Sequence, residues 1–294
     1  MNAQKIIQKL DAYERLMRLD KPIGILLLLW PTLWALLIAA QGKPDWIVLM
    51  IFVTGTVLMR SAGCVMNDIA DMKYDGLVER TKNRPLANNE VSKKEAYILA
   101  TVLSLVAFGL VCFLNTLTIQ LSVFALILAA SYPFTKRFLA IPQAYLGIAF
   151  GFGIPMAFAA IMGYIAPIAW VLLLANIFWA IAYDTEYAMV DREDDLKIGI
   201  KSSAITFGRF DVVAVMICYA LTLLLLVIAG KWLQLNYAYY LGLVAAAGVA
   251  IYHYFLIKNR EKAKCFKAFL HNNWFGFAVF LGLAAHYLMR YLVK

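Results

Sequence analysis

The segment WIVLMIFVTGTVLMRSAGCVMNDIADMKYD, residues 46–75, contains most of the information about the fold. From Trp46 to Met66 nearly every residue is apolar, and a helix of about 20 apolar residues can cross the hydrocarbon core of a bilayer. An asparagine and three aspartates then follow, where such a helix would leave the membrane. The segment therefore predicts a membrane helix whose exit carries a polar site.

The composition of the whole chain agrees with a membrane protein. Of its 294 residues, 63% are hydrophobic and 15% are charged, and the mean hydropathy is +0.74. Soluble domains carry about 25% charged residues. The net charge of +9 fits basic loops that face an anionic membrane surface better than it fits nucleic-acid binding. The four cysteines form no CxxC or Cys/His cluster, which gives no support to a zinc site or a disulfide framework.

Nine segments are long and apolar enough to span a bilayer as helices, and no part of the chain requires strands. They lie near residues 23–40, 46–66, 96–114, 118–135, 144–163, 166–185, 211–229, 237–256 and 273–290. Some contain proline or glycine, as in the GFGIP run from Gly151 to Pro155, and such residues often mark kinks or close packing in membrane helices. We therefore predict an all-α membrane domain of nine transmembrane helices over residues 23–294.

Residues 1–22 are predicted to form a separate amphipathic surface segment. They contain five basic and three acidic residues, and they lack the apolar run and cleavage site of a signal peptide. Apolar residues recur near helical spacing at Ile6, Ile7, Leu10, Tyr13 and Met17. This pattern is typical of a helix that lies on a membrane surface.

The number of basic residues alternates between high and low from one loop to the next. One set of loops is rich in Lys and Arg: five in the N-terminal segment, six in residues 67–95, two in 136–143, four in 186–210 and five in 257–272. The intervening loops carry only Lys43 and Lys231. Positive charge marks cytoplasmic loops, so the N-terminus and the exit of the second span are predicted to be cytoplasmic. Nine spans then place the C-terminus, with Arg290 and Lys294, outside the cytoplasm.

The spacing of the acids at the exit of the second span divides them into two groups. Asn67, Asp71 and Asp75 recur every fourth residue, and on a helix such positions drift by only about 40° per step, so their side chains line one face. Asp68 points about 100° away. Like charges stacked on a helix destabilise it, so this row predicts a compensating cation.

A second acidic cluster follows four spans later, in YDTEYAMVDREDDLKIGIKS, residues 183–202. If the helix continues through the cluster, Asp184, Asp191 and Asp195 lie on one face. Oxygen ligands with no His or Cys nearby suit Mg²⁺ or Mn²⁺ rather than zinc. Two such rows at equivalent helix ends are predicted to hold a diphosphate between bound metal ions.

Basic residues accompany both rows. Arg80, Lys82 and Arg84 follow the first row, Tyr132, Lys136 and Arg137 end the fourth span, and Lys197 and Lys201 follow the second row. Arg and Lys beside a metal-bound diphosphate would stabilise the charge that grows on the leaving group. Positive-inside topology also explains part of this charge, and Arg84 and Arg137 are the stronger candidates.

These motifs, in this order, resemble the UbiA superfamily of intramembrane prenyltransferases. The resemblance covers almost the whole chain and rests on NDxxDxxxD followed by RTxxRPL, on YPFxKR, and on YDTxYAMxDxxDDxxxGIKS. The opening MRLDKPIGxLLLLWPTLWAL, residues 17–36, and the YDTEYAM stretch resemble the branch that prenylates 4-hydroxybenzoate in ubiquinone biosynthesis.

The resemblance implies a nine-helix enzyme of the bacterial inner membrane, whose central cavity opens to the cytoplasm and sideways to lipid. Two Mg²⁺ ions would be held by Asn67, Asp71, Asp75, Asp191 and Asp195, with Asp68 and Asp184 at further motif positions. Polyprenyl diphosphate would ionise to an allylic cation, and the ring of 4-hydroxybenzoate would attack through the carbon ortho to its hydroxyl and lose a proton.

The remaining predicted roles combine this chemistry with the basic residues that accompany the two rows. The diphosphate-binding residues would be Arg80, Arg84, Tyr132, Lys136, Lys197 and Lys201, and the catalytic residues would be Asp71, Asp75, Asp191, Asp195 and Arg137. Arg137, Arg18 and Lys21 are each candidates for binding the acceptor carboxylate.

Two other kinds of function compete with this one. Within the family, the acceptor could be a naphthoate, homogentisate, or a haem or chlorophyll acceptor. Outside it, an ion-coupled transporter would also place acids in membrane helices, but here the acids lie at span ends beside basic loops rather than at mid-membrane. A purely structural membrane protein gives no reason for two aligned carboxylate rows.

Overall fold

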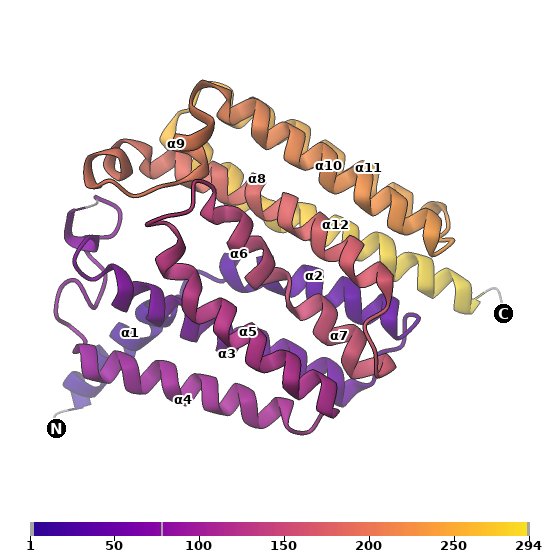
Figure 1. Cartoon of the computed structure of the whole chain (residues 1–294), viewed down its shortest axis with the longest axis horizontal. Coiled ribbons are helices and arrows are strands. Elements are labelled where there is room, and N and C mark those ends of the chain that lie inside the picture. Colours follow the sequence, from indigo (N-terminus) through magenta and orange to yellow (C-terminus); the bar gives the residue numbers. More distant parts are fainter. Residues whose placement is uncertain (1–2, 78, 293–294) are drawn as a thin grey trace.

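The computed structural model describes residues 3–77 and 79–292, and within them every regular element is a helix (Figure 1). The α-helices are α1 (Ala3–Met17), α2 (Ile23–Ala39), α3 (Trp46–Asp71), α4 (Lys93–Val111), α5 (Thr116–Thr135), α6 (Pro142–Gly151), α7 (Gly153–Met162), α8 (Pro167–Ile198), α9 (Ser203–Phe207), α10 (Asp211–Trp232), α11 (Tyr237–Ile257) and α12 (Lys262–Leu292). Short 3-10 turns form η1 (Asp75–Leu77) and η2 (Gly208–Phe210). The all-α prediction is confirmed for this part of the chain, and Lys294 lies outside the described residues.

Eight helical segments in the described part of the chain are long and apolar enough to cross a membrane. The α6–α7 pair counts as one of them, and so does the run from α9 to α10. By contrast, α2 is apolar but has only 17 residues, which extend about 26 Å at 1.5 Å per residue, slightly less than a typical hydrocarbon core. The first of the nine predicted spans, residues 23–40, therefore stays a prediction, and so does the total of nine.

The break between α6 and α7 falls at Phe152, inside the GFGIP run that predicted a kink. A Cβ added at Gly151 would lie 2.6 Å from Nδ2 of Asn176 on α8, and one added at Gly153 would collide with Oγ1 of Thr32 on α2. These two glycines let the broken helix approach α8 and α2 closely, as small residues do at helix interfaces in membranes.

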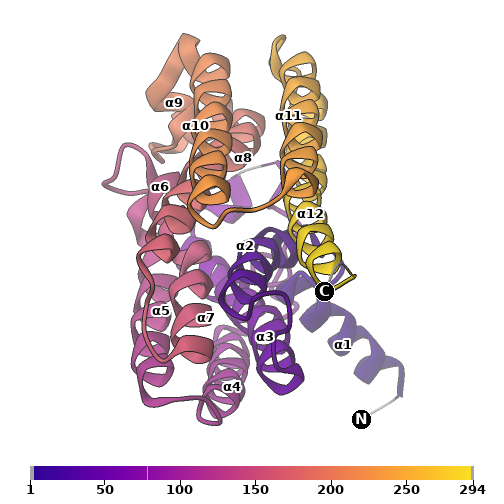
Figure 2. The ribbon, with the colours of Figure 1, turned by 90° about the vertical axis from the view of Figure 1, so that its right-hand side faces the viewer.

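The long helix α8 lies in the middle of the bundle. Its Trp179 stacks on Trp34 of α2 and on Phe275 of α12, with ring centroids 5.5 Å and 5.4 Å apart. In Figure 2, α10, α11 and α12 lie on one side of α2, and α3, α4 and α5 lie on the other. The stack therefore joins α2, α8 and α12 through fully buried aromatic side chains.

Helix α3 ends earlier than the acidic pattern suggested. Its last residue is Asp71, and the Tyr74 amide closes a turn on the Asp71 carbonyl at 2.7 Å. Asp75 begins the η1 turn instead of extending the helix. The prediction that Asn67, Asp71 and Asp75 share one helix face is therefore wrong for Asp75, which a turn brings back toward the bundle.

Helix α8 continues beyond its apolar part, as the second acidic cluster required. It has 32 residues and ends at Ile198, followed by the C-cap residue Gly199, which adopts a left-handed conformation with φ of 73°. Asp184, Asp191 and Asp195 therefore belong to one helix, and their spacing places them along one side of it.

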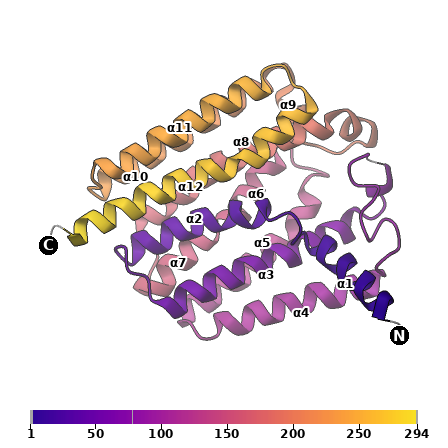
Figure 3. The ribbon, with the colours of Figure 1, turned by 180° about the vertical axis from the view of Figure 1, so that it is seen from behind.

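Helix α1 packs across the ends of α3 and α4 (Figure 3). Its Ala12 and Leu16 are buried, and Arg15 pairs with Glu90 at 2.5 Å in the loop before α4. Ile6 and Ile7 stay exposed on the opposite side, at 41% and 66%. The amphipathic character of the helix is thus visible, and its role as a separate surface segment stays a prediction.

Candidate functional site

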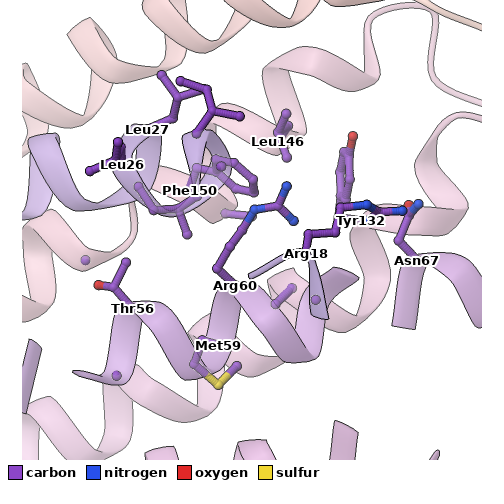
Figure 4. A pocket seen from close by; sticks show the side chains of 18 of the residues that line it. Arg18, Leu26, Leu27, Thr56, Met59, Arg60, Asn67, Tyr132, Leu146 and Phe150 are labelled. Carbon is purple, nitrogen blue, oxygen red and sulfur yellow. The ribbon is translucent and has the colours of Figure 1, made fainter. Parts of the chain in front are cut away.

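A cavity of about 1150 Å³ lies among α2–α8 and α12. Along α3 its lining runs from Ile51 to Asn67, a distance of about 24 Å at 1.5 Å per residue. Figure 4 shows apolar side chains such as Leu146 and Phe150 on its wall, together with the polar Arg18 and Asn67. The cavity therefore combines a long apolar space with charged and polar groups at the acidic end of α3.

The last turn of α3 meets the end of α5 at this charged end. Asp71 is 4% exposed, and it accepts a hydrogen bond from Nδ2 of Asn67 at 3.2 Å. Nζ of Lys136, the C-cap residue of α5, donates to the same carboxylate. The structure thus brings together three residues that the sequence predicted for one site.

The loop after α3 is held by buried arginine–carboxylate pairs. Nη1 of Arg84 lies 3.0 Å from Oδ1 of Asp68 and 2.9 Å from Oδ1 of Asp75, and Nη2 of Arg18 donates to Asp68 at 2.7 Å. Because Asp68 is only 1% exposed, it anchors both arginines at the edge of the cavity. Burial raises the pKa of the Asp75 carboxyl, while Arg84 acts in the opposite direction.

Arg80 connects this loop to the second acidic cluster on α8. Its Nη2 donates to Oδ2 of Asp191 at 2.6 Å, and its Nε lies 3.0 Å from both carboxylate oxygens. The guanidinium also lies 4.6 Å from the ring centroid of Tyr187, in a cation–π contact. The two acidic clusters, more than 100 residues apart in sequence, therefore meet in space.

Lys136 and Arg80 both act on Asp195, the last acid of the second cluster, through their charges. Deeper along α8, Asp184 lines the cavity opposite α5, which contributes Tyr132. One member of each predicted row, Asn67 and Asp184, therefore lines this cavity.

Three of the predicted residues lie elsewhere. Arg137 is exposed, and its Nη2 donates to the Ala70 carbonyl at 3.0 Å. Lys197 bonds to Asp194 at 3.2 Å, and Lys201 donates to the Phe138 carbonyl at 3.1 Å. None of the three is among the residues that line the cavity in the described part of the chain. Asp68, Asp71, Asp75, Lys136, Asp191 and Asp195 do not line it either, although Asp68, Asp71, Asp75 and Asp191 contact residues that do. The roles of all these residues in catalysis, metal binding or diphosphate binding stay predictions.

Sequence reasoning missed Arg60, which reaches into the cavity from the middle of α3 (Figure 4). Its Nη1 donates to Sγ of Cys64 at 2.5 Å and its guanidinium lies 5.6 Å from the ring centroid of Phe150, while its Nε is buried without a hydrogen-bond partner. Two signals could have identified it. A charge inside an apolar span is usually functional, and the i, i+7 spacing to Asn67 places both on one side of the helix.

Two buried oxygens among the carboxylates at the charged end are suited to a divalent cation. In residues 3–77 and 79–292, no three Asp, Glu, His or Cys side chains converge as a metal site, because basic side chains separate the acids. However, Oδ2 of Asp68 and Oδ1 of Asp71 are buried and accept no hydrogen bond. Such oxygens are costly to leave unpaired, and they are hard ligands. The donor set therefore fits Mg²⁺ that binds together with phosphate oxygens.

Comparison with known proteins finds relatives over nearly the whole length of the chain. Residues 28–283 match the model of the UbiA prenyltransferase family. A 4-hydroxybenzoate octaprenyltransferase of Azoarcus sp. is 68% identical over 281 residues, which are 96% of this chain and 98% of that protein. A protein of the same name from Methylobacillus flagellatus is 65% identical, over 97% of this chain and 96% of its own length.

Solved structures show the same fold. A UbiA homologue from Aeropyrum pernix superposes with a TM-score of 0.77 at 24% identity, over 91% of this chain and 98% of its own. A UbiA homologue from Archaeoglobus fulgidus, solved with GPP and Mg²⁺, superposes with a TM-score of 0.66 at 19% identity, over 92% and 99%. The arrangement of helices is therefore shared across distant sequences.

Proposed function

Because the chain belongs to the UbiA prenyltransferase family, we propose that it transfers a polyprenyl group from polyprenyl diphosphate to 4-hydroxybenzoate, at the carbon ortho to the hydroxyl. This is an early membrane step of ubiquinone biosynthesis. Relatives that match nearly the whole chain at 68% and 65% identity carry the name of this activity, and their names specify an octaprenyl chain. The observation that carries the chemistry is a single cavity with residues of both acidic clusters at one end and apolar walls beyond.

The diphosphate of the donor fits the charged end of this cavity. We infer that Asn67, Asp71, Asp75, Asp191 and Asp195 would hold Mg²⁺ there, with Asp68 and Asp184 close by. The bound ion would neutralise negative charge on the diphosphate as it leaves. The A. fulgidus homologue solved with GPP and Mg²⁺ supports this assignment through its shared fold.

Basic side chains of the chain itself supply further positive charge. Lys136 pairs with Asp71, Arg80 with Asp191, and Arg84 with Asp75 and Asp68. With these carboxylates engaged by a bound cation, Lys136, Arg80 and Arg84 would be free to face the diphosphate. They can then donate hydrogen bonds to its oxygens as the allylic C–O bond breaks, which stabilises the charge on the leaving group.

The apolar part of the cavity suits the polyprenyl tail and the allylic cation. Leu105 and Phe108 of α4 and Leu126 of α5 line it and are 63%, 42% and 45% exposed. We infer that the cavity opens sideways to lipid between these helices, so that the tail stays in apolar surroundings. Apolar walls also exclude water, which would otherwise capture the cation before the ring of the acceptor attacks.

Arg60 is the residue best placed to bind the carboxylate of 4-hydroxybenzoate. An acceptor carboxylate inside an apolar cavity requires a charged donor, and Arg60 brings one into the cavity from the middle of α3. Arg18 already pairs with Asp68, and Arg137 lies outside the cavity. Lys21 lines the cavity, but its side chain is 72% exposed and lies 3.8 Å from Asp20. We therefore assign the acceptor carboxylate to Arg60, a residue absent from the candidates that the sequence suggested.

The assay that tests the function uses membranes containing the chain. Polyprenyl diphosphate and ring-labelled 4-hydroxybenzoate should yield a labelled lipid in the presence of Mg²⁺, and EDTA should abolish it because the leaving group then lacks its counter-ion. Mass spectrometry and NMR should place the new bond ortho to the hydroxyl. Product from a naphthoate or homogentisate alone would assign another acceptor, and gradient-dependent uptake without a lipid product would favour transport.

We also propose that the acidic end of the bundle faces the cytoplasm and that the C-terminus lies outside. The start of α1 and the end of α12 lie at opposite ends of the bundle, which supports an odd number of crossings (Figure 1). The loops at the acidic end carry most of the Lys and Arg residues, as positive-inside topology requires.

A native cysteine allows this orientation to be tested. Cys112 follows α4 and is exposed, whereas the other three cysteines are buried. A membrane-impermeant maleimide should therefore label intact spheroplasts at Cys112, and Cys112→Ser should remove the signal. On that background, Lys82→Cys in the loop after α3 should react only after permeabilisation. The reverse pattern of labelling would refute the orientation.

A further inference from the structure

Gly24, in the first turn of α2, lies directly against the guanidinium of Arg60. A Cβ added at Gly24 would be 2.5 Å from Nη2 and 2.8 Å from Cζ of Arg60, closer than real Cβ contacts come. Both residues line the cavity, and Gly24 is buried. The missing side chain of Gly24 is therefore the space in which the guanidinium lies.

Helix propensity gives no reason for a glycine here. Gly24 has no unusual backbone conformation, and alanine would favour the helix by about 1 kcal/mol over glycine. The neighbouring atoms that a methyl group would meet belong to the far end of one long side chain. An alanine would therefore fit by moving the guanidinium, at small cost to folding.

The guanidinium is otherwise held from two further directions. Nη1 of Arg60 donates to Sγ of Cys64 one turn along α3, and the ring of Phe150 on α6 lies beside the charge. Three helices, α2, α3 and α6, therefore fix one cation in the cavity. Of these contacts, the one with Gly24 is purely steric. A methyl group added at Gly24 would therefore move the Arg60 guanidinium without removing its charge.

We propose that Gly24 is a positioning residue, which sets the place of the Arg60 guanidinium and thereby the affinity for the acceptor carboxylate. The inference rests on the proposed function, because it requires an acceptor that carries a carboxylate. It adds to the acceptor site a residue of α2 that carries no charge or polar side chain, and that a search for such side chains would not identify.

The test compares Gly24→Ala with Gly109→Ala, a helical glycine of α4 that does not line the cavity and has no atoms near its missing Cβ. Gly24→Ala should raise the KM for 4-hydroxybenzoate by about tenfold, the size expected when one charge-assisted hydrogen bond is weakened. The KM for polyprenyl diphosphate, and the KM for the neutral methyl 4-hydroxybenzoate, should stay unchanged. Gly109→Ala should behave as the wild type.

A double-mutant cycle shows whether Gly24 acts through Arg60. In an Arg60→Met background, Gly24→Ala should have no further effect on the KM for 4-hydroxybenzoate. An equal loss in both backgrounds, or an equal loss with the neutral ester, would overturn the inference. The wild-type enzyme is measured alongside. If the wild type prenylates 4-hydroxybenzoate and Gly24→Ala has the same KM for this acceptor, the role of Gly24 is refuted while the proposed function stands. A wild type without product refutes the proposed function instead.

Discussion

Asp71→Asn is expected to reduce kcat by about a hundredfold to a thousandfold, a loss comparable to that of other groups that stabilise charge in a transition state. Asparagine keeps the size of the side chain and can still contact Asn67 and Lys136, but it removes the negative charge that would bind Mg²⁺. The KM for 4-hydroxybenzoate should change little, because Asp71 lies at the diphosphate end of the cavity. Asp191→Asn on α8 should give a similar loss, since we place both carboxylates around one diphosphate.

Glu193→Gln is the matched control for these variants. Glu193 is on α8 two residues after Asp191, but it is exposed and pairs with Lys262 outside the cavity. Its amide variant should retain wild-type turnover. Initial rates with purified protein, together with the elution profile in detergent, separate a chemical defect from a folding defect. Wild-type rates in Asp71→Asn or Asp191→Asn would contradict the metal assignment.

Arg60→Met is expected to lower kcat/KM for 4-hydroxybenzoate by roughly thirtyfold or more, because removing one partner of a buried charge pair costs about 2 kcal/mol or more. Methionine preserves much of the apolar volume of the arginine stem, so the wall of the cavity should stay filled. Most of the loss should appear in the KM for the acceptor. The KM for polyprenyl diphosphate should be close to that of the wild type.

The neutral methyl ester of 4-hydroxybenzoate is the internal control for this variant. Without a carboxylate it cannot pair with Arg60, so Arg60→Met and the wild type should use it with similar kcat/KM values. Steady-state rates with both acceptors give the comparison. An Arg60→Met enzyme that instead loses affinity for polyprenyl diphosphate would move Arg60 from the acceptor site to the donor site.

Hydropathy and spacing predicted the parts of the fold that depend on local pattern. Apolar run length located the membrane helices, and the GFGIP run located the break at Phe152. The i, i+7, i+11 spacing of the second cluster was sufficient for α8, because that helix continues through its acids. Length alone did not decide α2, whose 17 residues are close to the limit for a span.

The remaining parts of the site depend on tertiary contacts that no local pattern encodes. Asp75 follows a turn, and its buried ion pair with Arg84 holds it near the bundle. In the sequence, the neighbouring Gly76 is the one residue that indicates this turn. Arg137 follows Lys136 in sequence, yet it points to the outer surface while Lys136 turns inward. Arg60 lies inside the apolar helix α3, so the distribution of charge among the loops gives no sign of it.

Binding of Mn²⁺ in place of Mg²⁺, followed by electron paramagnetic resonance, tests the convergence of the two acidic clusters most directly. In the presence of an unreactive polyprenyl diphosphate analogue, the wild type should bind Mn²⁺ tightly, since the metal has ligands from the protein and from the diphosphate. Asp71→Asn on α3 and Asp191→Asn on α8 should each lose this binding, while Glu193→Gln retains it. Wild-type Mn²⁺ binding in either aspartate variant would contradict a diphosphate site shared by both clusters.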